Sequence, residues 1–122
     1  MVDRSAPASG LDAFRELERW LSGQAALGSG MSELERESER QGREILRLAL
    51  QAHIDARGDG DVGAAIMVDG DPQPQRLTHK RLHTRPLVTL FGEVRVTRMG
   101  YGARGQDAIH PLDAELRLPG RL

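Results

Sequence analysis

The chain has 122 residues, of which 39% are hydrophobic and 3% aromatic, so it has material for one modest core at most. Cysteine is absent, which excludes a disulfide framework and a thiolate zinc site. No apolar run approaches the roughly 20 residues that span a bilayer, and no signal peptide is apparent at the N-terminus. We therefore expect a small cytoplasmic protein without membrane association.

The formal net charge of −1 hides an uneven distribution of charge along the chain. Residues 1–75 hold eight Lys or Arg against fourteen Asp or Glu, whereas residues 76–104 hold seven basic residues against Glu93 alone. A basic segment of this kind is where a polyanion would bind. The alternative is that the acidic and basic parts neutralise each other in the fold.

The first ten residues are rich in Ser, Ala, Pro and Gly, and we expect them to be disordered. A helix is predicted over residues 11–24, because Ser9 can cap it and apolar residues recur at helical spacing. These apolar residues are Leu11, Phe14, Leu17, Trp20 and Leu21. A stripe of this kind usually packs in a core, although it can also dock a partner.

A second helix is predicted over residues 33–56, after a glycine-rich break at residues 28–30. Ser32 and Glu35 form a capping-box pattern at its start. The first half of this helix is almost wholly charged, and its apolar second half is expected to carry the packing. The charged half is either solvated or faces a partner helix, and the second option would make a homo-oligomer through the helices.

The segment 55–61 alternates acidic residues with glycine, as calcium loops do. A loop counted from Asp55 has Arg57 at its third position and Ile66 at its twelfth, where calcium needs oxygen ligands. We therefore predict a helix end at Gly58 followed by a turn, and no metal site.

Residues 58–79 are predicted to connect the helices to the C-terminal part of the chain. The short apolar run at residues 64–68 is either a strand or a covered extended segment. Pro72 and Pro74 favour an extended linker after it.

A β-hairpin is predicted from Leu82 to Tyr101, with a two-residue turn at Gly92 and Glu93. This register predicts a core face with Arg98 at its rim. The predicted core face comprises Leu87, Thr89, Phe91, Val94 and Val96, and the opposite face comprises Val88, Leu90, Arg95 and Thr97.

Six basic residues of this C-terminal part are candidate DNA-binding residues: Lys80, Arg81, Arg85, Arg95, Arg98 and Arg104. A two-stranded ribbon can lie in or beside a DNA groove, where such side chains neutralise phosphates. The alternative is a solvated strand edge whose charges prevent edge-to-edge aggregation.

Histidines and nucleophiles suggest no catalytic or metal site. His79 and His83 have the spacing of half a zinc site, but the other ligands would have to come from distant segments. We interpret these residues, with His53 and His110, as surface or capping histidines. No Gly-rich phosphate loop or nucleophile–base set is present, so we expect no cofactor, no metal and no catalysis.

Two motifs near the C-terminus carry a resemblance to a known family. They fit the patterns TxFGxVxVTRxxY and HPxDAxLxLP. The matching residues are Thr89, Phe91, Gly92, Val94, Val96, Thr97, Arg98 and Tyr101 in the first, and His110, Pro111, Asp113, Ala114, Leu116, Leu118 and Pro119 in the second. Together they resemble the N-terminal region of insertion-sequence transposases of the ISKra type. In this family a metal-dependent nuclease core with an acidic triad is expected to follow.

The resemblance implies a transposase fragment that contributes to binding of the element ends in DNA transposition, without catalysis of its own. The chain ends at Leu122, where relatives continue, so we expect a truncated copy that lacks the catalytic core. Asp107 and Asp113 are accordingly given no catalytic role, and no small-molecule substrate is expected. The alternatives are a structural or oligomerisation segment and a non-functional remnant.

The predicted architecture is α+β, with two N-terminal helices followed by a C-terminal antiparallel β-hairpin, small or only partly ordered. Its expected segments are a disordered N-terminus (1–10), a helical segment (11–57), a connector (58–79) and a basic hairpin with a tail (80–122).

Overall fold

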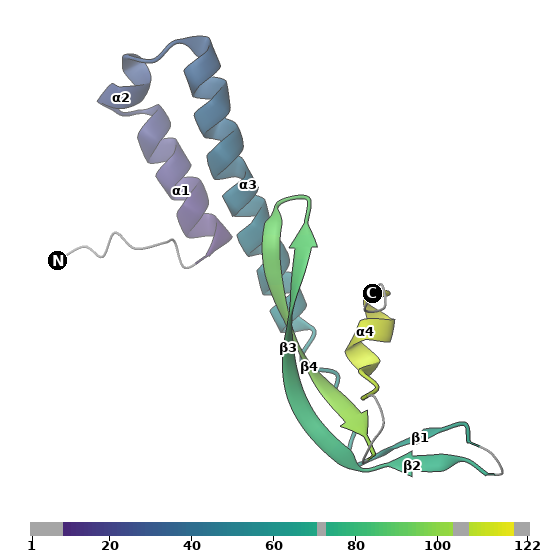
Figure 1. Ribbon diagram of the computed structural model, residues 1–122. Helices are drawn as coiled ribbons and strands as arrows, with labels where there is room; N and C mark the ends of the chain where they lie inside the picture. The colour runs from purple at the N-terminus through teal and green to yellow at the C-terminus, as the bar shows by residue number, and fades with distance from the viewer. Residues whose placement is uncertain (1–8, 71–72, 104–107, 119–122) are drawn as a thin grey trace. The chain divides into compact units, whose positions relative to one another are not determined.

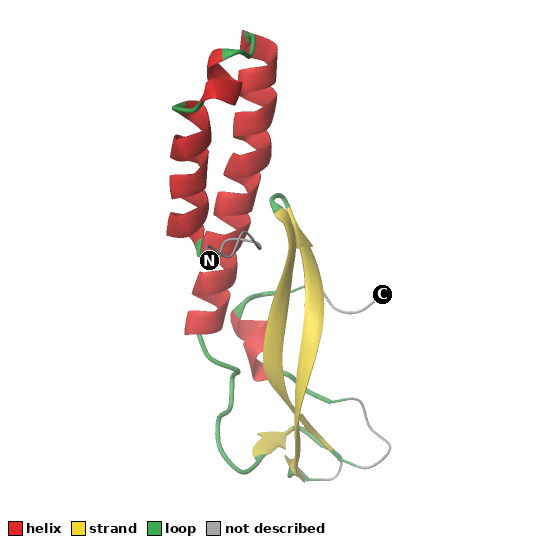
Figure 2. Cartoon of the chain, turned by 90° about the vertical axis from the view of Figure 1, so that its left-hand side faces the viewer, coloured by secondary structure: helices red, strands yellow, loops and turns green. Residues whose placement is uncertain are grey.

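The structure is a computed structural model, and it describes residues 9–70, 73–103 and 108–118 (Figure 1). The helices in these ranges are α1 (Gly10–Leu21), α2 (Gln24–Leu27), α3 (Met31–Ala56) and α4 (Pro111–Glu115). The strands are β1 (Ile66–Val68), β2 (Gln75–Leu77), β3 (His79–Thr89) and β4 (Gly92–Gly102). They form two separate two-stranded antiparallel sheets, β1 with β2 and β3 with β4 (Figure 2).

The predicted arrangement of two helices followed by a single hairpin is wrong, although the chain is mixed α+β. A short additional helix, α2, follows α1, and the segment predicted as a connector contains the β1–β2 sheet. The predicted tail contains α4. Strand β1 lies in the apolar run at residues 64–68, for which a strand is one of the two predicted alternatives. Elements α2, β2 and α4 are not predicted, because three to five residues are too few for hydrophobic periodicity to reveal them. Residues 1–8, which we expected to be disordered, lie outside the described residues.

Contacts divide the chain into two compact units, which are described separately. Unit 1 comprises Met1–His53 and Leu87–Val94, and unit 2 comprises Ile54–Pro86 and Arg95–Leu122. Helix α3 and the β3–β4 hairpin each contribute residues to both units. Among the described residues, no helix combines the length and the apolar composition needed to cross a membrane.

The helix starts follow local capping chemistry. Ser9 is the N-cap of α1, where its Oγ accepts a hydrogen bond from the N–H of Asp12 at 3.1 Å, as predicted. Helix α3 begins at Met31, so that Ser32 lies within its first turn. The capping-box prediction at Ser32 is therefore wrong.

The turn of the β3–β4 hairpin differs from the prediction. It consists of Leu90 and Phe91, and Gly92 is the first residue of β4, with a φ of 116°. The Oγ1 of Thr89 accepts from the N–H of Phe91 at 3.1 Å and donates to the Gly92 carbonyl at 2.7 Å. These side-chain bonds fix the turn two residues earlier than predicted. Phe91 and Leu90, which were predicted to lie on the two faces, therefore form the turn, whereas Val94 and Val96 are buried and Val88, Arg95 and Thr97 are exposed, as predicted.

The core of unit 2 is built on the inner face of the hairpin and on α4. Its most buried apolar side chains are Leu77, Val96, Tyr101 and Leu112. The backbone of Gly60 packs directly against Leu112: a Cβ at Gly60 would lie 2.9 Å from the Leu112 backbone nitrogen and 2.9 Å from its Cβ. The loop before β1 therefore closes over α4 only with glycine at this position.

Substitutions at two glycines of this loop distinguish the cost of backbone strain from the cost of the close approach to Leu112. Gly58 and Gly60 have φ values of 80° and 76°, but a Cβ at Gly58 would meet nothing within 4 Å. We expect Gly58→Ala to cost about 1–2 kcal/mol of unfolding free energy, and Gly60→Ala to cost roughly 1–3 kcal/mol more. Urea denaturation of the two variants measures this difference, and equal losses would contradict the packing of Gly60 on Leu112.

Candidate functional site

Three basic side chains of unit 2 surround the carboxylate of Asp113, in the first turn of α4. The Nε of Arg98 donates to Oδ1 of Asp113 at 3.0 Å. The Nη1 of Arg85 lies 3.6 Å from Oδ2, and the Nδ1 of His110 lies 4.0 Å from the same oxygen. Arg85 belongs to β3 and Arg98 to β4, so this carboxylate connects α4 to both strands of the hairpin.

Arg98 is buried, and the prediction that it lies at the rim of the core face is wrong. The residue is 2% exposed, and its Nη1 is buried without a hydrogen-bond partner among the described residues. Val94 and Val96 precede it at two-residue spacing and are also buried, so Arg98 simply continues the inward-facing set of β4. Its positive charge is paired with the carboxylate of Asp113.

His83 and His110 extend this cluster. The Nδ1 of His83 lies 3.0 Å from the Nε2 of His110, so that one ring donates a hydrogen bond to the other. The ring centroids are 5.2 Å apart, and the rings are tilted by 59°. In the described part of the chain no three metal-ligating side chains gather into a possible metal site. The structure brings His83 together with His110.

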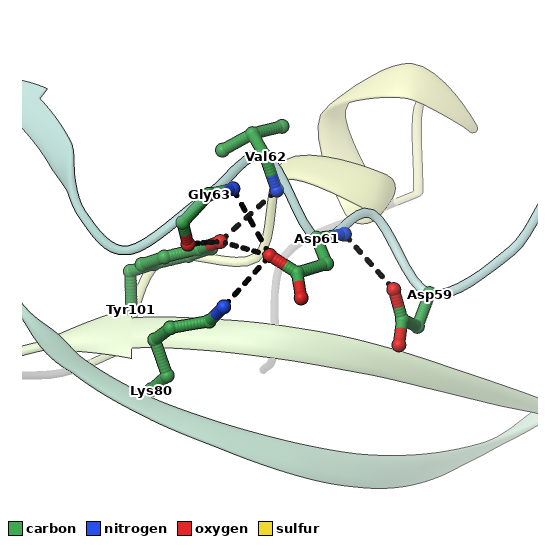
Figure 3. Close-up of polar contacts among 6 residues, drawn as sticks. All are labelled: Asp59, Asp61, Val62, Gly63, Lys80 and Tyr101. Atoms are coloured by element: carbon green, nitrogen blue, oxygen red, sulfur yellow. Dashed lines mark hydrogen bonds and ion pairs between the residues drawn. The ribbon is translucent and has the colours of Figure 1, made fainter.

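A second polar cluster joins the loop after α3 to the end of β4 (Figure 3). The Oδ1 of Asp61 lies 2.8 Å from the Nζ of Lys80 and 2.9 Å from the hydroxyl oxygen of Tyr101, and it accepts from the N–H of Gly63 at 3.0 Å. The Tyr101 hydroxyl also accepts from the N–H of Val62 at 3.0 Å and lies 2.7 Å from the Gly63 carbonyl. Since Tyr101 is fully buried, its hydroxyl fixes the loop from inside unit 2.

The electrostatics of this second cluster favour the ionised forms of its two charged groups. The Lys80 ammonium group, followed by the Gly63 N–H and the Tyr101 hydroxyl, lowers the pKa of Asp61 from 3.8 to about 2. The hydrogen bond to Asp61 in turn raises the pKa of Lys80. Lys80 also lies over the Tyr101 ring, 5.8 Å from its centroid. Lys80 is therefore held in place by contacts within the chain.

The structure separates the predicted DNA-binding residues into two groups. Arg85 and Arg98 face inward and contact Asp113. The other members that the structure describes, Lys80, Arg81 and Arg95, are exposed. Arg104 lies outside the described residues.

Sequence reasoning missed the partners of the buried charges. It assigned no role to Asp61 and treated Asp113 only as a motif residue. A signal was present: Arg98 follows Val94 and Val96 on the inward-facing side, and a buried guanidinium requires an anionic partner. The motif that follows supplies Asp113 as such a partner, although only the fold shows that the two meet.

Comparison of the chain with protein-family models, with curated proteins and with solved structures found no match. The resemblance to the N-terminal region of transposases stays a prediction that depends on the two motifs.

Removing the charge of Asp113 tests the importance of the buried cluster. Asp113→Asn leaves the buried Arg98 without an anion, and we expect a loss of about 2–4 kcal/mol of unfolding free energy. The matched control is Glu115→Gln, on the same helix, because the Glu115–Arg57 pair lies at the surface and should contribute less than about 1 kcal/mol. Chemical denaturation of both variants measures the difference, and similar losses would show that Arg98 does not depend on Asp113.

Acid titration tests the second cluster. A carboxyl whose pKa is lowered by folding stabilises the protein above its unfolded pKa, and this contribution disappears as the pH falls through the folded pKa. The stability advantage of the wild type over Asp61→Asn should therefore be constant above about pH 5, decrease below pH 3.8 and continue to fall as the pH passes through about 2. Thermal unfolding of both proteins across this range measures the advantage, and a pH-independent difference would contradict the assignment.

Proposed function

We propose that this chain is a non-catalytic DNA-binding module of the transposase type, and that its β3–β4 hairpin contacts the phosphates of element-end DNA. The observation that carries the proposal is the exposure of Arg81 on β3 and Arg95 on β4, while Arg85 and Arg98 are turned inward to Asp113. Both strands of one ribbon thus present a cation to solvent. Such a ribbon can follow the phosphates on either side of a groove.

The positions of the motif residues support a binding module without catalysis. Val96, Arg98, Tyr101 and Asp113 all carry the resemblance, and all four hold unit 2 together through burial or ion pairing. Because these side chains stabilise the fold of unit 2, the motifs form a structural scaffold that holds the exposed residues of the hairpin in place. Asp113 in particular is neutralised by Arg98, which is a structural role.

The contribution of each exposed cation is electrostatic. A phosphate contact releases condensed counterions, so that affinity falls with salt by a slope of about 0.9 per phosphate neutralised on duplex DNA. Lys80 is less available, because it is paired with Asp61 at 2.8 Å. Arg81 and Arg95 are the exposed arginines of the described part of the hairpin, and we expect them to contribute most to the salt slope.

A charge-matched pair of variants tests the proposal. Arg81→Ala with Arg95→Ala should weaken binding to duplex DNA and reduce the salt slope by about 2. The control, Arg19→Ala with Arg36→Ala, removes the same charge from exposed positions on α1 and α3 and should change the slope little. Fluorescence anisotropy over a salt series gives both values.

Two outcomes would contradict this function. Absence of wild-type binding to element-end duplexes at low salt rules out DNA binding. Equal effects of the two double variants would show that only net charge matters, and that the hairpin is not the contact surface.

A further inference from the structure

The helices of unit 1 bury very little of their apolar surface. Ala13 is the only buried residue of α1 and Ala26 the only one of α2. The one buried residue of α3, Ile54, belongs to unit 2. Helices become stable in water chiefly by packing an apolar face against another layer. Unit 1 also contains the buried Val94 of β4, and Arg43 of α3 donates to the Leu90 carbonyl of the hairpin, but several large apolar side chains of α1 and α3 remain partly exposed.

Helix α1 runs antiparallel beside α3 within unit 1 (Figures 1 and 2). Gly10 approaches α3 so closely that a Cβ there would lie 3.4 Å from the Ile45 carbonyl oxygen and 3.7 Å from the Ala49 Cβ. Gly10 and the buried Ala13 therefore mark the side of α1 that faces α3. Leu11 and Phe14 follow these two residues by one position each, which is a rotation of about 100° away from the contact.

Large apolar residues gather on this second side of the helix pair. Because α1 and α3 run antiparallel, the residue that follows a contact residue lies on the same side of the pair in both helices. Leu46 follows Ile45, whose carbonyl lies close to Gly10, so Leu46 lies on the same side as Leu11 and Phe14. Leu21 lies seven residues after Phe14 and therefore on the same side of α1. The resulting apolar face consists of Leu11, Phe14, Leu21 and Leu46, which are 58%, 46%, 44% and 48% exposed.

Two residues of opposite charge lie on the same side of α1 as this face, four and seven residues after Leu11. Arg15 and Glu18 lie on either side of the midpoint between Leu11 and Leu21, and both are exposed. Neither side chain has an ion-pair partner in the described part of the chain. If a second α1 lies antiparallel against the first, each Arg15 meets a Glu18. Leu11 at one end then meets Leu21 at the other, so the surface is complementary to itself.

We propose that the apolar face of α1 and α3 binds the same face of a second copy of this chain, forming a two-fold symmetric four-helix arrangement. Leu11 packs against the partner's Leu21, and Arg15 pairs with the partner's Glu18. Phe14 lies near the two-fold axis. A partner with a uniformly charged rim would repel either Arg15 or Glu18, whereas a second copy satisfies both. This interface supplies the helical layer that unit 1 lacks.

The association is measured on the full chain without DNA, which makes it independent of the proposed DNA binding. In sedimentation equilibrium the wild type should reach twice its mass of 13.4 kDa as concentration rises. Phe14→Asp should raise the dissociation constant at least tenfold, because it places a charge at the centre of the interface. The matched control is Val88→Asp on β3, where an apolar side chain is 83% exposed but lies outside this face, and it should leave the constant within twofold.

A charge exchange tests the pairing itself. Arg15→Glu and Glu18→Arg should each weaken the dimer, and the double variant should restore the wild-type constant, since it only reverses the direction of the two ion pairs. Circular dichroism verifies that the helices persist in every variant. A wild type that stays monomeric up to about 1 mM, the weak end of specific association, would overturn the proposal. So would a dimer that survives Phe14→Asp, or a double variant that remains as weak as the single ones.

Discussion

The buried charge of Arg98 is the constraint on which the architecture of unit 2 depends. A guanidinium cannot lose its proton in a protein, so its burial requires an anion at a fixed position. Asp113 provides that anion at 3.0 Å, from a helix of five residues that is too short to be stable alone. The ion pair and the burial of Leu112 therefore contribute to the stability of α4 at least as much as its local helix propensity does.

The same constraint sorts the basic residues of the hairpin. Alternation along β4 turns Arg98 inward and Arg95 outward, and Asp113 draws Arg85 inward as well. What looks in the sequence like one basic cluster is thus divided between a structural set and an exposed set. Among the described basic residues of this segment, Arg76, Lys80, Arg81 and Arg95 are exposed, so the number of cations at the surface is smaller than the count of seven suggests.

Sequence reasoning located the long elements and the faces of the hairpin, because these depend on local patterns. Ser9 caps α1 as predicted, and the inward set of β4 follows from two-residue alternation. It missed the hairpin turn because glycine at position 92 suggested a turn there, whereas the Thr89 hydroxyl stabilises an earlier one. The β1–β2 sheet, α4 and the clusters around Asp61 and Asp113 depend on contacts between distant segments, which no local pattern encodes.

The two units obtain their stability in different ways. In unit 2, polar side chains fix the elements that pack on the hairpin. Tyr101 bonds to Asp61 in the loop after α3, and Arg98 bonds to Asp113 of α4. These contacts cover one face of a two-stranded sheet, which would be only marginally stable alone in water. In unit 1, four large apolar side chains of α1 and α3, those of Leu11, Phe14, Leu21 and Leu46, are 44–58% exposed. The buried charge of Arg98 and the buried hydroxyl of Tyr101 are therefore used to stabilise unit 2, whereas α1 and α3 leave these four apolar side chains partly exposed. The proposed association would use residues of α1 and α3, and the proposed DNA contact would use Arg81 and Arg95 of the hairpin, so the two proposals depend on different residues.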